Sequence, residues 1–130
     1  MDNIEVHLTQ EQAEFLLKEW QERLNLQHWK IKIKVARGGD LDLPGGLQGR
    51  CDMILNRLEA FIRILDPIDW DKTILWPQDM EATLVHELLH LHWVSLDKWQ
   101  ANSPEVTAME QAIHSISHAL VDAKRGRSEE

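Results

Sequence analysis

Two histidines and a glutamate lie close together in the segment HELLH, which spans residues 86–90. On an α-helix, His86 and His90 are separated by about one turn, so both imidazoles project from the same side. Glu87 lies about 100° round the helix axis from His86, where its carboxylate can contact a water held by a metal ion between the histidines. The residue types and their spacing therefore predict a metal site with an adjacent proton acceptor.

The surroundings of this segment are apolar, which makes its polar groups unusual. Leucine or valine occupies most neighbouring positions: Leu84, Val85, Leu88, Leu89 and Leu91. A buried carboxylate without a compensating partner is unfavourable or shifts its pKa, and a metal with its water removes that problem. The alternative without a metal is a set of hydrogen-bonded core residues. A closed structural zinc site is disfavoured, because such sites are usually rich in cysteine and the chain has only Cys51.

A catalytic zinc site usually takes three protein ligands and leaves one position for water, so a third ligand must be found. The extended motif, with a histidine six residues after His90, is absent because Leu96 occupies that position. His92 points to another side of the helix. The remaining candidates all lie in the last predicted helix: Glu105, Glu110, His114 and His118. The residues alone leave the choice among these four open.

Periodicity and capping signals predict the elements that position these residues. A capping box followed by an apolar stripe predicts a first helix over residues 10–25. Strict alternation of apolar and basic residues predicts a strand over 29–35, and two more strands are expected over 48–55 and 60–66. These three strands precede the HELLH segment, so we expect a sheet packed against the metal helix.

Two helices follow the strands. Pro77 in a first turn and an apolar run over 82–96 predict the helix that carries HELLH. Ser103 as N-cap and Pro104 as first residue predict the start of the last helix, which a glycine stops at position 126.

The order of helix, three strands, helix and helix predicts an α+β fold with a small, mainly antiparallel sheet. At 130 residues the chain fits a single domain over 1–130. We expect an ordered core over about 9–124, followed by a short polar C-terminal tail.

The composition excludes several classes of partner. The formal net charge is -8, so the surface field repels nucleic acid and anionic lipid. The sequence has neither the basic amino-terminal region of a signal peptide nor an apolar run of about 20 residues. We therefore expect a cytoplasmic protein that acts without nucleic acid or membrane.

The HELLH segment together with Glu110, twenty residues after His90, resembles the glutamate-type zincins. The compact layout, with strands directly before the metal helix, is similar to minimal zincin-like metallopeptidases of phages, prophages and other mobile elements. The likeness in layout covers residues 29–122. The resemblance implies that His86, His90 and Glu110 hold one Zn²⁺ ion and that Glu87 is the catalytic base.

The function implied by this resemblance is zinc-dependent hydrolysis of a peptide bond in a protein or peptide substrate. Zinc would lower the pKa of its water toward ~7, while Glu87 takes the proton and delivers it to the leaving amine. Relatives commonly stabilise the oxyanion with tyrosine or histidine, and this chain has no tyrosine. His114 or His118 could serve as that donor, or as an alternative third ligand.

The substrate strand can also be inferred from the resemblance. In zincins the strand before the metal helix commonly lies at the sheet edge and pairs with an extended peptide. The matching segment by position is residues 60–65, with Phe61, Ile62 and Arg63 at its centre. Two alternatives to a peptidase stay open: a metal-dependent hydrolase of another bond, and a non-enzymatic binding module stabilised by its metal.

Overall fold

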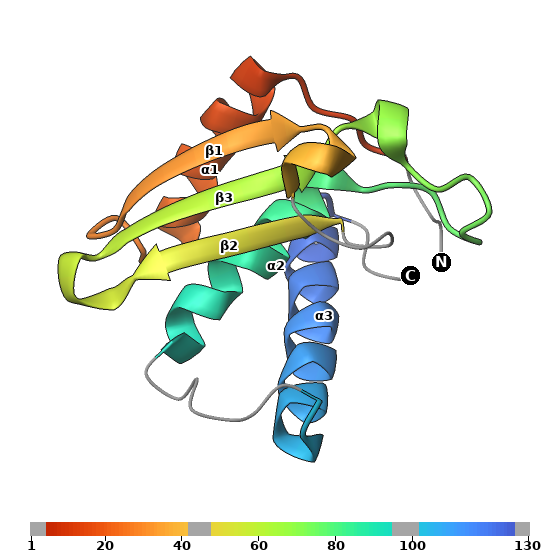
Figure 1. Ribbon diagram of the computed structural model, residues 1–130. Coiled ribbons are helices and arrows are strands. Elements are labelled where there is room, and N and C mark those ends of the chain that lie inside the picture. The colour runs from red at the N-terminus through yellow and green to blue at the C-terminus, as the bar shows by residue number, and fades with distance from the viewer. Residues whose placement is uncertain (1–4, 42–47, 95–101, 127–130) are drawn as a thin grey trace.

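The computed structural model describes residues 5–41, 48–94 and 102–126. These residues form three α-helices and a small three-stranded sheet in the predicted order, so the α+β class is confirmed (Figure 1). Helices α1 and α2 pack against the sheet, and α3 packs on α2. The predicted polar tail, residues 127–130, lies outside the described residues. Within the described part of the chain, no helix is both long and apolar enough to cross a bilayer.

Helix α1 (Gln10–Arg23) begins at the predicted capping box. The Thr9 hydroxyl accepts a hydrogen bond from Gln12 N, and Thr9 N donates to Gln12 Oε1. This exchange satisfies two of the backbone donors that the first turn leaves without a partner. The buried face of α1 consists of Ala13, Leu17 and Trp20.

The sheet contains β1 (Lys30–Ala36), β2 (Gly49–Ile54) and β3 (Glu59–Leu65), in the spatial order β1-β3-β2. β3 pairs parallel with β1 and antiparallel with β2, so the expectation of a mainly antiparallel sheet is wrong and the sheet is mixed. The physical reason is the hairpin between β2 and β3. It reverses the chain, and β3 then inserts beside β1 in the direction that β1 runs.

The prediction that Phe61, Ile62 and Arg63 form an edge strand is also wrong. All three lie in the central strand, where Ile62 is paired with Ile33 of β1 on one side and with Cys51 of β2 on the other. Ile62 is fully buried. Apolar alternation in a sequence reports which face of a strand is covered, but not the lateral position of that strand in the sheet.

The two edge strands differ in how their outer backbone groups are satisfied. On β1, the side-chain amide of Gln10 donates to Ile33 O at 2.7 Å and accepts from Val35 N at 2.9 Å. The Gln10 side chain thus makes the backbone hydrogen bonds that a further strand beside β1 would make at these two residues. Among the described residues, no strand pairs with the outer edge of β2. β2 therefore offers the sheet edge that an added strand could use.

Helix α2 (Met80–Trp93) runs through the centre of the core. Its buried residues are Met80, Glu81, Ala82, Leu84, Val85, Glu87, Leu88, Leu89 and Leu91. Pro77 precedes the helix instead of occupying its first turn, because the carboxylate of Asp79 caps the helix by accepting from Ala82 N. The HELLH segment thus lies on a helix that is buried over most of its length.

Helix α3 (Pro104–Lys124) begins with Ser103 as N-cap and is followed by Gly126 at a φ of 70°, both as predicted. Its fully buried residues are Ile113, Ser117 and Val121. Ile116, also on α3, is 38% exposed. The row that meets α2 follows a spacing of four residues, and Ile116 lies to the side of this row.

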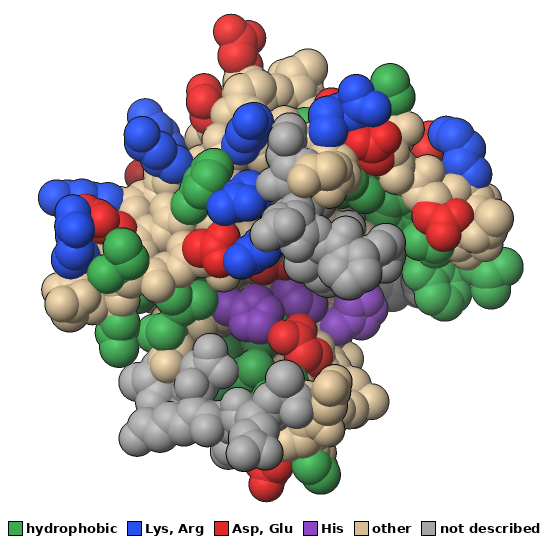
Figure 2. Space-filling model, in the orientation of Figure 1, with side chains coloured by type: hydrophobic (Ala, Val, Ile, Leu, Met, Phe, Trp, Pro, Cys, Tyr) green, Lys and Arg blue, Asp and Glu red, His purple; other side chains and the backbone are tan. Residues whose placement is uncertain are grey.

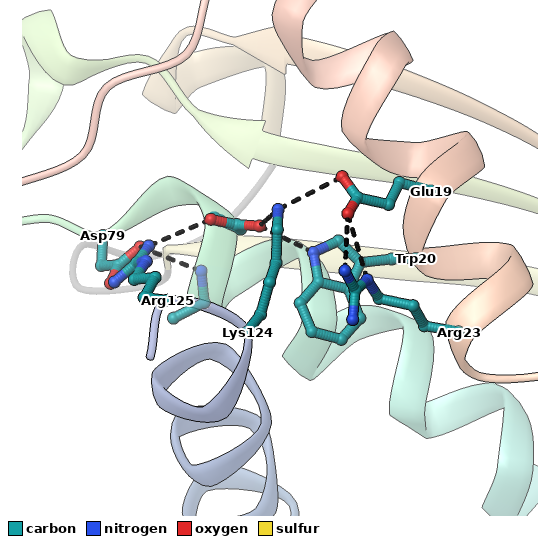
Figure 3. Close-up of polar contacts among 8 residues, drawn as sticks. Glu19, Trp20, Arg23, Asp79, Lys124 and Arg125 are labelled. Atoms are coloured by element: carbon teal, nitrogen blue, oxygen red, sulfur yellow. Dashed lines mark hydrogen bonds and ion pairs between the residues drawn. The ribbon is translucent and has the colours of Figure 1, made fainter. Parts of the chain in front are cut away.

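Buried charges fasten the end of α3 to the start of α2 (Figure 3). Arg125 donates to both carboxylate oxygens of Asp79, at 2.9 and 3.0 Å, and to Glu81 Oε1 at 3.1 Å. Lys124 Nζ contacts Glu81 and, at 3.2 Å, Glu19 of α1. We call Asp79, Glu81, Lys124 and Arg125 the charge clamp. It sets the placement of α3 against the helix that carries HELLH.

Candidate metal centre

His86, His90 and Glu110 meet between α2 and α3. His86 Nε2 lies 3.1 Å from Glu110 Oε1, and His90 Nε2 lies 3.4 Å from Glu110 Oε2. One ligand atom from each residue can be chosen so that all three lie within 4.8 Å of one another. Among the described residues, this is the one group of three or more such side chains that could hold a metal ion.

The helices explain why these side chains converge. His86 and His90 are one turn apart on α2, with ring centroids 5.3 Å apart, and their side chains are only 24% and 20% exposed. Figure 2 shows histidines gathered in a hollow of the surface, with a carboxylate next to them. Burial and the neighbouring His90 lower the pKa of His86, while the carboxylate of Glu110 acts in the opposite direction. A neutral imidazole is the form that binds a metal.

Glu87 lies in a closed environment beside this group. Glu87 as a whole residue is only 7% exposed. Burial, the charge of Glu110 and the charge of Asp52 raise the pKa of Glu87 to about 8. A carboxyl group with such a pKa can take up and release a proton near neutral pH, which is the property required of a general base and acid.

The start of β2 lies directly over Glu87. A Cβ atom added to Gly49 would stand 3.1 Å from Glu87 Oε2 and 2.7 Å from Thr83 Cγ2. Further along the strand, burial followed by the charges of Glu87 and Asp52 raises the pKa of the Cys51 thiol to about 12. Cys51 is therefore a protonated packing residue, as its isolation in the sequence indicates.

Gly49→Ala is expected to destabilise the protein by about 1–3 kcal/mol, because the new methyl group overlaps Thr83 and crowds Glu87. The measurement is the free energy of unfolding from urea denaturation. Gly39→Ala is the matched control, since a Cβ there meets no atom within 4 Å. Equal stability of the two variants would show that β2 does not approach Glu87 this closely.

The other predicted site residues have different surroundings. His114 is exposed on α3 and lines a pocket of about 400 Å³ together with His86, Glu110, Gln111 and Ser115. It therefore stays a candidate donor to an oxyanion.

His118, one turn further along α3, lies outside this lining. Burial and His114 lower the pKa of His118, whereas Asp79 and Asp122 raise it. Glu105 is exposed in the first turn of α3, and His92 is exposed on α2. Neither Glu105 nor His92 joins the group of His86, His90 and Glu110.

Two residues of the site, Gly49 and Asp52, were not predicted from the sequence. Gly49 begins a strand, and an isolated glycine in a strand pattern can signal a close backbone approach. That signal was available but not specific. Asp52, whose charge acts on Glu87, carries no sequence signal, because the hairpin alone brings β2 over α2.

We compared this chain with known proteins by sequence and by structure. No protein family model matches the sequence, and neither curated protein sequences nor solved structures give a significant match. A function is therefore inferred from the side chains of the site itself.

Proposed function

We propose that this chain is a zinc-dependent metallopeptidase of the minimal zincin-like kind. His86, His90 and Glu110 hold one zinc ion in this proposal, and Glu87 is the general base. The observation that carries it is the convergence of three donor atoms within 4.8 Å of one another, next to a buried carboxylate whose pKa is raised to about 8. The position of Glu110 is independent of the HELLH spacing, because Glu110 comes from a different helix.

The donor set fits zinc. Two imidazoles and one carboxylate are a ligand set of open catalytic zinc sites, whereas structural sites are usually closed by four ligands that include cysteine. When bound there, zinc supplies a Lewis acid that polarises a carbonyl and lowers the pKa of a coordinated water. Glu110 also suits this role electrostatically, because its carboxylate neutralises part of the charge of a divalent ion.

The role of Glu87 follows from its burial. It accepts a proton from the water that attacks the scissile carbonyl, and it returns this proton to the amide nitrogen as the peptide bond breaks. A divalent cation nearby would lower the raised pKa of Glu87 and so favour the ionised form that accepts the proton. Gly49, at the start of β2, lies close to this carboxylate.

We assign the substrate-pairing strand to β2 in place of Phe61, Ile62 and Arg63. β2 is the edge strand that starts over Glu87, whereas the outer edge of β1 is occupied by the amide of Gln10. An extended peptide added along β2 would bring its backbone close to Glu87. This arrangement favours a protein or peptide substrate over a small molecule.

Zinc binding to the triad can be tested with single substitutions. Glu110→Ala is expected to weaken zinc binding by about 100-fold or more, because it removes one of three ligands. The measurement is zinc affinity in competition with a chelator of known strength. Glu105→Ala is the control, since that glutamate is exposed and outside the triad.

His114→Ala addresses the competing assignment of the third ligand. The tight zinc site is expected to survive this change. If His114→Ala removes the tight zinc and Glu110→Ala retains it, the proposed ligand set is wrong. If all three variants bind zinc as tightly as the original chain, the triad is not the metal site.

A further inference from the structure

Helix α3 carries a second pair of histidines at the spacing found in HELLH. His114 and His118 are four residues apart, and their ring centroids are 4.4 Å apart with an angle of 51° between the planes. The corresponding values for His86 and His90 are 5.3 Å and 55°. The mutual arrangement of the two pairs is thus similar, although the pair on α3 is exposed to solvent.

We propose that His114 and His118 form a second, weaker binding site for a divalent transition ion. Two imidazoles one turn apart on a helix can bind the same ion, and imidazole suits zinc, nickel and copper. In the described part of the chain, no third side chain joins this pair to complete a group of three ligands. Water fills the remaining positions, so the ion exchanges more readily than one held by three protein ligands.

The charges around the pair are mixed but include two acids. Asp79 and Asp122 act on His118 as negative charges, and Arg125 opposes them. Asp122 lies one further turn along α3 from His118, so its carboxylate is on the same side of the helix. Asp79, whose charge acts on His118, accepts hydrogen bonds from both terminal nitrogens of Arg125.

An ion bound to His114 and His118 would affect the pocket next to the first metal site. His114 lines the pocket that also contains His86 and Glu110. An ion on His114 and His118 would therefore stand at the side of that pocket. Excess metal would then inhibit hydrolysis, a consequence that rests on the proposed function. The binding site itself does not depend on it.

The test is a count of bound ions. Tag-free, metal-depleted full-length chain is titrated with Zn²⁺, and separately with Ni²⁺, by calorimetry and by equilibrium dialysis with elemental analysis. We expect two ions per chain, the second bound at least about tenfold more weakly because it has fewer protein ligands. His118→Ala is expected to lose the second ion and keep the first.

The matched control is His92→Ala, which removes an exposed histidine on α2 and should retain both ions. His114→Ala is a second variant that should again leave one ion. Binding of a single ion by the original chain would overturn the proposal, as would a second ion that survives both His114→Ala and His118→Ala. These counts are independent of hydrolysis. Failure of the proposed peptidase function would instead appear as zinc-loaded protein that cleaves no substrate.

For the inhibitory consequence, zinc in excess of one equivalent should reduce hydrolysis by the original chain. It should reduce hydrolysis by His118→Ala much less. Equal inhibition of both proteins would show that the second ion does not obstruct the pocket.

Discussion

Glu87→Gln is expected to reduce peptide hydrolysis by about 10²- to 10⁴-fold, because glutamine cannot accept the proton of the attacking water. Zinc content should stay at about one ion per chain in the tight site, since Glu87 is not among the three ligands. The measurement is cleavage of a proteome-derived peptide library followed by mass spectrometry, at equal zinc occupancy of the two proteins. If zinc-loaded original chain and Glu87→Gln cleave identically, or neither cleaves any peptide, the peptidase function is wrong.

The same substitution has a second readout in the metal-free protein. Burial and the charges of Glu110 and Asp52 raise the pKa of Glu87 to about 8, above the ordinary value of 4.5. The folded state therefore holds this proton more tightly than the unfolded state, and stability is lost as the pH rises from about 4.5 to about 8. Glu87→Gln removes that loss. Metal-free Glu87→Gln should exceed the original chain in stability by an amount that grows across this pH window, which shows that its inactivity is not misfolding.

Arg125→Met is expected to lower the free energy of unfolding by about 3 kcal/mol, because it leaves Asp79 and Glu81 buried without their shared partner. The side chain of Arg125 is only 17% exposed and that of Glu81 only 7%. The measurement is urea denaturation of the metal-free protein at pH 7. Metal-free conditions separate the charge clamp from any contribution of ligand binding.

Arg57→Met is the matched control for this prediction. Arg57 also forms an ion pair, with Glu59 at 3.3 Å, but its side chain is 64% exposed. The loss there should be below about 1 kcal/mol, as for other exposed pairs. A loss at Arg125 as small as that at Arg57 would contradict the assigned role of the charge clamp.

The pH dependence of the charge clamp supplies a further check on the same variant. Burial alone would raise the pKa of Glu81, but Lys124, Trp20 and Arg125 together lower it below its ordinary value. The stability that Glu81 contributes is therefore present above its unfolded pKa and is lost as the pH falls through the lowered value. The difference between the original chain and Arg125→Met should accordingly shrink in acid.

Local signals in the sequence predicted much of the fold. The capping box at Thr9 and the N-cap at Ser103 are confirmed, because each depends on contacts among residues three positions apart. Each of the three strands was also placed to within one residue at both of its ends. The lateral order of the strands could not be predicted, because a burial pattern such as that around Ile62 is the same in a central strand and in an edge strand covered on one face.

The sequence predicted part of the candidate site, as it predicted part of the fold. The pair His86 and His90 depends only on helical spacing, which is why five residues suffice to predict it. Glu110 comes from another helix, and the structure brings it to both imidazoles. The charge clamp could not be foreseen, because Glu81 and Arg125 are 44 positions apart and meet only once α3 has packed on α2. Whether Glu110 binds the metal stays a prediction.

The central claim is that His86, His90 and Glu110 hold one zinc ion. Anomalous X-ray diffraction from zinc-loaded crystals, recorded on both sides of the zinc absorption edge, tests it most directly. We predict a strong anomalous peak at about 2.0–2.2 Å from one nitrogen of each histidine and one oxygen of Glu110. An anomalous peak from tightly bound zinc at another position would contradict this claim. So would a zinc ion that His86 and His90 bind without Glu110.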